Sequence, residues 1–445
     1  MPPASSTTDV AAEPQRIPRS EHTVSRKHIS ANALQVLSRL HDAGHRALLV
    51  GGGVRDLLLG GQPKDFDVAT DATPEEIKRL FRSCRLIGRR FRLAHVRFGR
   101  EIIEVATFRG EHDGAGDGHV QHDGRIVRDN VFGTLEEDVR RRDFTVNALY
   151  YDFADQSVID FVGGMQDLRD GVLRLIGEPE KRYREDPVRM LRALRFAAKL
   201  GFELQSDCAD AIRELGELLE EISSARLFEE VLKLFQSGHG ERTMELLREY
   251  DLLIYLLPMT DSAMRRDPFA ERLMTQALTN TDARIAEGKP VTPAFMFAAF
   301  LWPSVSRRTA ELRERGEPAN AALEQAASEL MPAQLEATAL PRRFAVPMRE
   351  IWQLQDRLTE LNGKRALRLL GHPRFRAAYD FLCLRVEAGE KLRKAATFWT
   401  EIQEQNPEQQ ARTAAAVGAN KQRRGRGRGR RRRRRPTVES AAAPT

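Results

Sequence analysis

Two carboxylates in one short stretch are the residues best suited to chemistry in this chain. They lie in Val50–Ala69, VGGGVRDLLLGGQPKDFDVA. Asp65 and Asp67 are two residues apart on an expected strand, so their side chains should project from one face of a sheet. Clustered carboxylates repel each other unless a cation lies between them, and Mg²⁺ commonly joins one or two carboxylates to substrate phosphates. The spacing therefore predicts a magnesium site.

A run of glycines precedes these carboxylates. Gly51–Gly53 follow Ala47–Val50, an apolar run that indicates a buried strand. Glycines beside a helix start allow backbone N–H groups to approach a phosphate. The segment is neither a P-loop nor a dinucleotide fingerprint, because no Gly-Lys-Ser/Thr follows it and its glycine spacing differs. A metal site beside an anion cradle indicates phosphoryl or nucleotidyl transfer.

Two later segments add candidate residues. In RRDFTVN, Arg141–Asn147, the carboxylate of Asp143 is a candidate third acid, and an ion pair with the neighbouring Arg140–Arg142 is the alternative. EDPVRMLRALRF, Glu185–Phe196, indicates a helix from Pro187 onward. Its cations recur at three- and four-residue spacing without an acid among them: Arg189, Arg192, Arg195 and Lys199. This stripe favours an anionic partner, and a solvated helix face is the alternative.

These segments, taken in order, resemble a known family. Gly52–Asp56 followed by Asp65–Asp67, with the two later segments, is similar to the class II nucleotidyltransferases, the branch shared by bacterial tRNA CCA-adding enzymes and bacterial poly(A) polymerases. The similarity runs from about residue 30 to about residue 400. It implies an α+β fold, with a small head of mixed sheet and helices followed by an all-helical region.

The resemblance also implies residue roles. It gives Asp65, Asp67 and Asp143 as catalytic residues, and it implies that Asp65 and Asp67 hold two Mg²⁺ ions. It implies that Asp186 and Arg189 hydrogen-bond the base edge of the incoming nucleotide. The full set of implied nucleotide contacts is Gly52, Gly53, Arg55, Arg142, Asp186, Arg189, Arg192 and Arg195. The implied reaction is attack of an RNA 3′-hydroxyl on the α-phosphorus of ATP, with release of pyrophosphate.

Three features favour the poly(A) polymerase branch. They are the segment Gly88–Val96, the body segments Arg349–Gln355 and Gly371–Leu384, and an Arg-rich tail. In bacteria, the poly(A) tails that these enzymes add to RNA promote its decay, and the resemblance implies that role. Two alternatives stay open. The chain could be a CCA-adding enzyme, which would incorporate CTP, or a non-catalytic RNA-binding protein with an inactive transferase head.

The charge of the chain is concentrated in its tail. The net charge is +7, but residues 421–435, KQRRGRGRGRRRRRR, contribute +11, so the rest carries −4. Such a tail cannot bury apolar surface and should be disordered. Arg/Gly-rich segments bind nucleic-acid backbones with little sequence preference. We therefore expect RNA contacts from Arg430, Arg431 and Arg432, and a merely solubilising tail is the alternative.

A second basic patch surrounds Phe91. Arg89, Arg90 and Arg92 could guide the RNA primer into the site, or could be an ordinary solvated strand end. No stretch approaches a membrane-spanning length, and Met1–Ser25 lacks the apolar region of a signal peptide. The three cysteines form no metal or disulfide pattern, which favours a reducing, cytoplasmic setting. A monomer acting on RNA 3′ ends, with RNA-decay machinery as a possible partner, is expected.

Local signals place the elements that position these residues. Helices are expected at Ser30–His41, at a capping box beginning with Thr73 and at another beginning with Thr134. Phe91–Phe98 and Ile102–Phe108 read as a hairpin, and helical patterns dominate after Pro179. The expected organisation is a disordered segment (1–25), a catalytic domain (26–178), a neck (179–240), an all-helical body (241–403) and a disordered tail (404–445).

Overall fold

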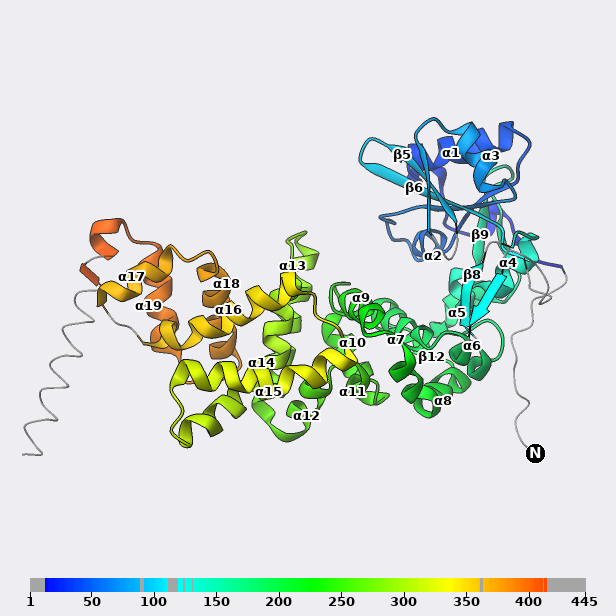
Figure 1. Cartoon of the computed structure of the whole chain (residues 1–445). Coiled ribbons are helices and arrows are strands. Elements are labelled where there is room, and N and C mark those ends of the chain that lie inside the picture. The colour runs from blue at the N-terminus through cyan, green and yellow to red at the C-terminus, as the bar shows by residue number, and fades with distance from the viewer. Residues whose placement is uncertain are drawn as a thin grey trace, which may run out of the picture. The chain divides into compact units, whose positions relative to one another are not determined.

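The chain forms two compact units. The computed structural model describes residues 13–88, 92–110, 119–122, 125–129, 131–360, 363–410 and 412–413. One unit spans Met1–Ile222 with Glu245–Leu252, and the other spans Ser223–Met244 with Leu253–Thr445. Figure 1 traces the elements of both units by colour along the chain. The division at Ile222 falls inside the expected neck segment 179–240, and the finer division into neck and body stays a prediction.

The first unit is built on an eight-stranded sheet of order β1-β10-β9-β2-β3-β6-β5-β4. Its strands are β1 Gln15–Ile17, β2 Ala47–Val50, β3 Asp67–Thr70, β4 Cys84–Ile87, β5 Leu93–Phe98, β6 Glu101–Thr107, β9 Leu149–Asp152 and β10 Val158–Asp160. All neighbours are antiparallel except β3 and β6, which are parallel. Two small sheets pair β7 His119–His122 with β8 Arg125–Asp129, and β11 Val172–Leu173 with β12 Glu203–Leu204.

Helices surround this sheet. The α-helices are α1 Ala31–Asp42, α2 Gly52–Leu58, α3 Pro74–Leu80, α4 Leu135–Arg141, α5 Gly164–Asp170, α6 Pro179–Glu185, α7 Val188–Leu200 and α8 Ser206–Leu215. Short 3₁₀ turns are η1 Arg19–Glu21, η2 Arg26–His28, η3 Thr145–Asn147 and η4 Gly216–Glu221. The expected capping boxes at Thr73 and Thr134 are confirmed, because each threonine side chain accepts the backbone N–H three residues later. Ser30 caps α1 by accepting from the backbone N–H of Ala33.

The sheet has two different faces. Helices α1 and α3 lie against one face, where alternate residues of β5 and β6 are buried. Helix α4 covers the other face, but over a different part of the sheet. It buries Leu135 and Val139 against Val50, Ala69 and Tyr150 on β2, β3 and β9. Asp67 shares this second face with Ala69 because the two residues are two apart on β3.

The expectation of a disordered segment at residues 1–25 is wrong for its second half. Gln15–Ile17 form β1, which pairs antiparallel with β10 at the edge of the large sheet. Ile17 and Val24 are buried. Two widely spaced apolar residues among polar ones gave no periodic pattern, so the local sequence did not reveal a strand that depends on an existing sheet edge.

The second unit is all-helical over its described residues, as expected. Its helices are α9 Ser224–Phe235, α10 Gly240–Glu249, α11 Leu253–Leu256, α12 Pro258–Arg266, α13 Pro268–Ala286, α14 Pro293–Glu314, α15 Ala319–Ala337, α16 Arg342–Thr359, α17 Gly363–Leu370, α18 Phe375–Glu387 and α19 Arg393–Gln403. The end of α10, from Glu245, belongs to the first unit. Two buried tryptophans tie helices together: Trp352 donates to the carbonyl of Ala298 (3.0 Å) and Trp399 to that of Leu358 (2.7 Å).

The α+β fold class is confirmed by this arrangement of a mixed-sheet unit and a helical unit. Among the described helices, none has both the length and the apolar character needed to cross a membrane.

Candidate active site

The glycine turn between β2 and α2 lies directly beside Asp67 and Arg142. Gly51 has a φ of +77°, a backbone conformation that other residues rarely adopt. A Cβ atom there would lie 3.7 Å from Oδ2 of Asp67 and 4.0 Å from Nη1 of Arg142. Gly52 and Gly53 open the first turn of α2, as expected. The turn therefore brings backbone, a carboxylate and a guanidinium together.

The carboxylate pair predicted from the sequence is only partly in the sheet. β3 begins at Asp67, so Asp65 precedes the strand and does not join its ladder. The backbone carbonyl of Asp65 instead lies against the start of α2, 3.3 Å from where a Cβ of Gly53 would be. Phe66, between the two aspartates, is buried. The two carboxylates still lie close enough for Asp65 to act electrostatically on Asp67.

A further carboxylate, which the sequence analysis did not single out, lies next to Asp67. Glu104 on β6 is the direct parallel partner of Asp67 on β3. Paired residues on neighbouring strands point to the same face, so the two carboxylates share one surface. The sequence placed Glu104 in an expected strand, but gave no sign that this strand would pair with the one carrying Asp67.

The negative charge at this point is not balanced within the described residues. Burial raises the pKa of Asp67, Glu104 and Asp65 raise it further, and Arg142 lowers it, with a result of about 6. A divalent cation would remove this repulsion, and oxygen ligands suit Mg²⁺. No three His, Cys, Asp or Glu side chains of the described residues form a complete ligand group. The arrangement therefore fits an ion held by few carboxylates, with substrate phosphates supplying further oxygens.

Glu104 is held on its other side by His95. Nε2 of His95 on β5 lies 3.1 Å from Oε1 of Glu104, and the two residues are partners in the β5–β6 ladder. The row of paired residues thus runs across three strands, from Asp67 through Glu104 to His95.

Arg142 is fixed by a buried acid. Its Nε and Nη2 donate to Oδ2 of Asp138 at 3.0 and 2.8 Å, and its Nε donates to the hydroxyl of Tyr150 at 2.6 Å. Tyr150 in turn donates to Asp138 (2.7 Å). Burial lowers the pKa of Arg142, but Asp138 and Tyr150 raise it by more, so the guanidinium stays charged. The group is a preorganised cation facing the glycine turn.

Asp143 forms its ion pair with Arg192 on α7, and not with the neighbouring Arg140–Arg142 considered from the sequence. Its Oδ2 accepts from Nε of Arg192 on α7 (3.0 Å) and also from Nη2, and its Oδ1 accepts from the backbone N–H of Phe144 (2.8 Å). Burial raises the pKa of Asp143, but the charge and hydrogen bonds of Arg192, together with the hydrogen bonds from Phe144 and Asn147, outweigh it, so the pKa falls to about 2. The carboxylate joins α7 to the rest of the site. Its catalytic role stays a prediction.

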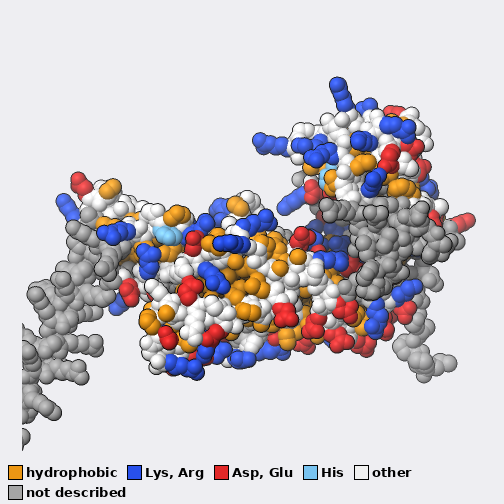
Figure 2. Space-filling model, viewed as in Figure 1, with side chains coloured by type: hydrophobic (Ala, Val, Ile, Leu, Met, Phe, Trp, Pro, Cys, Tyr) orange, Lys and Arg blue, Asp and Glu red, His pale blue; other side chains and the backbone are white. Residues whose placement is uncertain are grey.

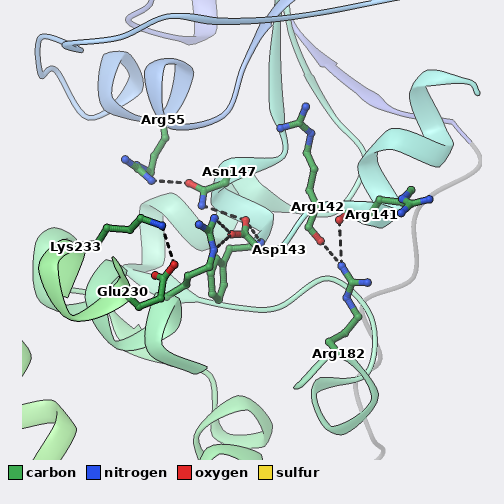
Figure 3. Close-up of polar contacts among 10 residues, drawn as sticks. Arg55, Arg141, Arg142, Asp143, Asn147, Arg182, Glu230 and Lys233 are labelled. Carbon is green, nitrogen blue, oxygen red and sulfur yellow. Dashed lines mark hydrogen bonds and ion pairs between the residues drawn. The ribbon is translucent and has the colours of Figure 1, made fainter. Parts of the chain in front are cut away.

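Arg55, expected at the triphosphate, lies beneath the turn. Its side chain is 2% exposed. Nε donates to Oδ1 of Asp56 (2.8 Å), and Nη1 donates to Oδ1 of Asn147 (2.5 Å). Nδ2 of Asn147 in turn donates to Oδ1 of Asp143 (3.4 Å). Figure 3 shows this chain of contacts from Arg55 through Asn147 to Asp143. In this arrangement Arg55 supports the glycine turn from behind, and contact with a nucleotide stays a prediction.

The basic stripe of α7 is largely neutralised. Lys199 pairs with Asp56 on α2 (3.1 Å), in addition to the pairing of Arg192 with Asp143. Three guanidinium carbons lie 5.1–5.5 Å from the ring centroid of Phe196, those of Arg55, Arg192 and Arg195. The stripe predicted for an anionic partner therefore also binds acids and an aromatic ring of its own unit.

The two residues expected to read the base flank the junction of α6 and α7. Asp186 is the C-cap residue that follows α6. Arg189 donates to Oε2 of Glu185 (2.9 Å) and to the carbonyl of Arg182 (2.7 Å). Arg182 donates to the carbonyls of Arg141 (3.3 Å) and Arg142 (2.6 Å), as Figure 3 shows. Burial and the neighbouring Arg189 lower the pKa of Arg182 to about 10, partly offset by Glu185. Arg182, which the sequence analysis missed, joins this junction to the end of α4.

The structure describes only one of the arginines predicted to contact RNA. Arg92 pairs with Glu75 of α3 at 2.7 Å, on the helix-covered side of the sheet. Arg89 and Arg90 lie outside the described residues, as do the tail residues Arg430, Arg431 and Arg432. Their RNA contacts stay predictions.

Three family models match the chain. The model described as the poly A polymerase head domain matches residues 47–174, which contain the site. The model described as a probable RNA and SrmB-binding site of polymerase A matches residues 201–264. The model described as the polymerase A arginine-rich C-terminus matches residues 315–437.

Curated relatives agree with the models. The chain is 52% identical over 403 residues to poly(A) polymerase I of Escherichia coli O6:H1, covering 88% of this chain and 87% of that one. It is 47% identical to poly(A) polymerase I of Haemophilus influenzae, covering 88% and 89%. The CCA-adding enzyme of Bacillus subtilis is 39% identical over 215 residues, 48% of this chain and 52% of that one. The chain therefore belongs to the bacterial poly(A) polymerase family.

Solved structures share the fold. A tRNA-processing enzyme in apo form I has a TM-score of 0.58 at 24% identity, covering 86% of this chain and 93% of that one. The Thermotoga maritima CCA-adding enzyme complexed with tRNA has a TM-score of 0.54 at 20% identity, covering 85% and 82%.

The Asp143–Arg192 ion pair predicts an acid sensitivity. The folded pKa of Asp143 lies below the ordinary value of 3.8, so the pair stabilises the fold above about pH 4, and this contribution is lost as the pH falls towards 2. Asp143→Asn should therefore lose less stability than the wild type between pH 4 and 2, by roughly 2 kcal/mol. Urea unfolding across that pH range measures the difference. Asp170→Asn, at an exposed position of α5, is the control, and equal acid sensitivity of all three proteins would refute the assignment.

Proposed function

We propose that the chain is a template-independent polynucleotide adenylyltransferase that adds AMP from ATP to RNA 3′ ends. The observation that carries this proposal is the pairing of Asp67 with Glu104, next to the Gly51 turn and the fixed cation of Arg142. Such a site combines acids for a metal, backbone for phosphates and a guanidinium for anionic charge. Membership of the poly(A) polymerase family supports ATP as the nucleotide and RNA as the acceptor.

The reaction joins the RNA 3′-oxygen to the α-phosphorus of ATP. The bond from that phosphorus to the bridging oxygen breaks, pyrophosphate leaves, and the hydroxyl proton passes to solvent. Two Mg²⁺ ions are expected, held by Asp65, Asp67 and Glu104. When bound there, they would activate the RNA 3′-hydroxyl and neutralise the negative charge of the departing pyrophosphate. Arg142 faces the turn as a fixed cation, and backbone N–H groups near Gly52 and Gly53 lie where triphosphate oxygens would be bound.

Nucleotide choice would be made by the protein, since no template strand takes part. Asp186 and Arg189 would hydrogen-bond the base edge from the junction of α6 and α7, with Arg192 and Arg195 further along the helix. Arg182 supports this assignment, because its bonds to the carbonyls of Arg141 and Arg142 connect the base-reading junction with the phosphate side of the site. Asp186 and Arg189, held in a fixed position, can discriminate between nucleotides because a wrong base cannot form the same hydrogen bonds.

The cellular setting follows from the same reading. The enzyme would act in the cytoplasm as a monomer, and its tails would mark RNAs for decay. The RNA-decay machinery would be a partner.

Primer extension tests the activity. Purified protein is given a generic RNA oligonucleotide or a tRNA lacking its 3′ end, with Mg²⁺ and one nucleotide at a time. Long products with ATP alone on the generic RNA are expected. Short additions restricted to tRNA and requiring CTP would instead make the chain a CCA-adding enzyme, and no extension with any nucleotide would favour a non-catalytic RNA-binding protein.

Removing either paired acid should stop transfer. Asp67→Asn and Glu104→Gln should each lower the rate of AMP addition at least about a hundredfold, because each loses a ligand charge needed in the transition state. RNA affinity, measured by filter binding, should change little. Glu75→Gln, at an exposed acid on α3, should retain full activity. Wild-type rates in Glu104→Gln would exclude Glu104 from the site.

Asp186→Ala should relax nucleotide choice. The preference for ATP over CTP, measured as a ratio of kcat/KM values, should fall by about tenfold or more because a hydrogen bond to the base edge is lost. Glu180→Ala, at an exposed position of α6, provides the control. An unchanged ratio in Asp186→Ala would contradict the base-reading role.

The Arg-rich tail should add to RNA binding through phosphate contacts. Removing residues 421–445 should weaken binding and flatten the dependence of log Kd on log salt, because fewer counterions are released from the RNA. Binding titrations at several salt concentrations measure this slope. A slope equal to that of the full chain would mean that the tail does not contact phosphates.

A further inference from the structure

The described helices of the unit leave one face of β4, β5 and β6 uncovered. Because strand residues alternate between faces, the registers of the ladders identify which side chains share it. They are Arg85 and Ile87 on β4, Leu93, His95 and Arg97 on β5, and Ile102 and Glu104 on β6. We refer to these residues as the open face. The alternate residues face α1 and α3.

Exposure confirms the difference between the faces. Ile87 and Ile102 are 38% and 40% exposed, which is unusual for large aliphatic side chains in a sheet. On the helix-covered side, Ala94, Val96 and Ile103 are buried. The open face thus offers apolar surface to a partner.

The open face is continuous with the active site. Arg85 pairs with His95, His95 with Glu104, and Glu104 with Asp67, so one row of partners crosses β4, β5, β6 and β3. Neighbouring strands lie about 4.8 Å apart, so the row places Arg85 about 14 Å from Asp67. A strand lying along this row would end at the paired acids.

The charge of the open face suits an anion. Arg85 and Arg97 are exposed and have no carboxylate partner within the described part of the chain. The arginines of α7 differ, since Arg189 and Arg192 are paired with acids. The single acid of the open face, Glu104, is bound by His95. Figure 2 shows basic side chains gathered at the end of this unit where β5 and β6 lie in Figure 1.

We propose that the open face holds the RNA strand immediately behind its 3′ end, with Arg85 and Arg97 at phosphates and Ile87 and Ile102 against bases. The inference rests on the proposed function, which requires a 3′-hydroxyl to reach Asp67. Sites for single-stranded nucleic acids combine cations that follow the backbone with side chains that cover the apolar faces of the bases. Arg85 and Arg97 supply the cations here, and the exposed aliphatic side chains of Ile87 and Ile102 supply apolar surface without aromatic stacking. The row of paired residues gives the direction in which the strand runs.

The charge contacts are tested with neutral substitutions. In the full chain, Arg85→Gln with Arg97→Gln should weaken the binding of a short single-stranded RNA roughly tenfold and reduce the slope of log Kd against log salt by about 1.4. The KM for ATP at saturating RNA should not change. Arg46→Gln is the matched control, since Arg46 is exposed at the opposite end of β2 from the glycine turn. Wild-type affinity and slope in the double variant would overturn the proposal.

The base contacts are tested separately. Ile87→Ser with Ile102→Ser should weaken binding of the same RNA but not of a ribose-phosphate strand that lacks bases. Equal losses for both strands, or no loss for either, would overturn the apolar part of the proposal. RNA extension by the wild-type protein separates a failure of the open-face proposal from a failure of the proposed function. A wild type that extends no RNA refutes the adenylyltransferase activity, whereas extension with unaffected variants refutes only the open face as the RNA surface.

Discussion

The active-site unit depends on the pairing of buried charges. A guanidinium that leaves water costs several kcal/mol unless acids and hydrogen bonds compensate it. Arg55 is almost fully buried, and it is held by Asp56 and Asn147, while Arg142 is held by Asp138. Asp56 and Asp138 lie close in the chain to the cations that they hold, but Asn147 reaches Arg55 from a distant segment. Helix α7 is tied in by Arg192, which pairs with Asp143, and by Lys199, which pairs with Asp56. The glycine turn, the end of α4 and helix α7 are therefore specified jointly, since loss of one partner leaves an unpaired charge inside the unit.

This pairing divides the arginines of the unit into two groups. On α7, Arg189 and Arg192 are paired with acids, and Arg195 lies over the ring of Phe196, so these side chains are held in place. Arg85 and Arg97, on the outer strands, have no such commitment within the described residues. Arg85 and Arg97 therefore place positive charge on the sheet that no described carboxylate offsets. Under the proposed function, the sheet would attract RNA and α7 would position the nucleotide.

Much of the site could be predicted from the sequence because its signals are local. The glycine turn, both capping boxes and the position of Asp67 at a strand start depend on residues close in the chain. Glu104 could not be identified in this way, because its importance comes from the parallel pairing of β6 with β3. The partner of Asp143 likewise lies 49 residues away on Arg192. Pairings between distant segments are decided by the packing of the whole unit, which residue spacing does not encode.

The short strand β1 also has a consequence for how the chain can be handled. It covers the outer edge of β10, whose backbone N–H and C=O groups would otherwise be unpaired. Exposed strand edges are templates for pairing with other chains. A protein shortened to begin after Ile17 would keep every residue of the active site. It would, however, expose β10 as an unpaired edge strand, at the edge of the sheet opposite β4. Self-association of such a truncated enzyme would then reflect the lost edge cover and not a natural oligomer.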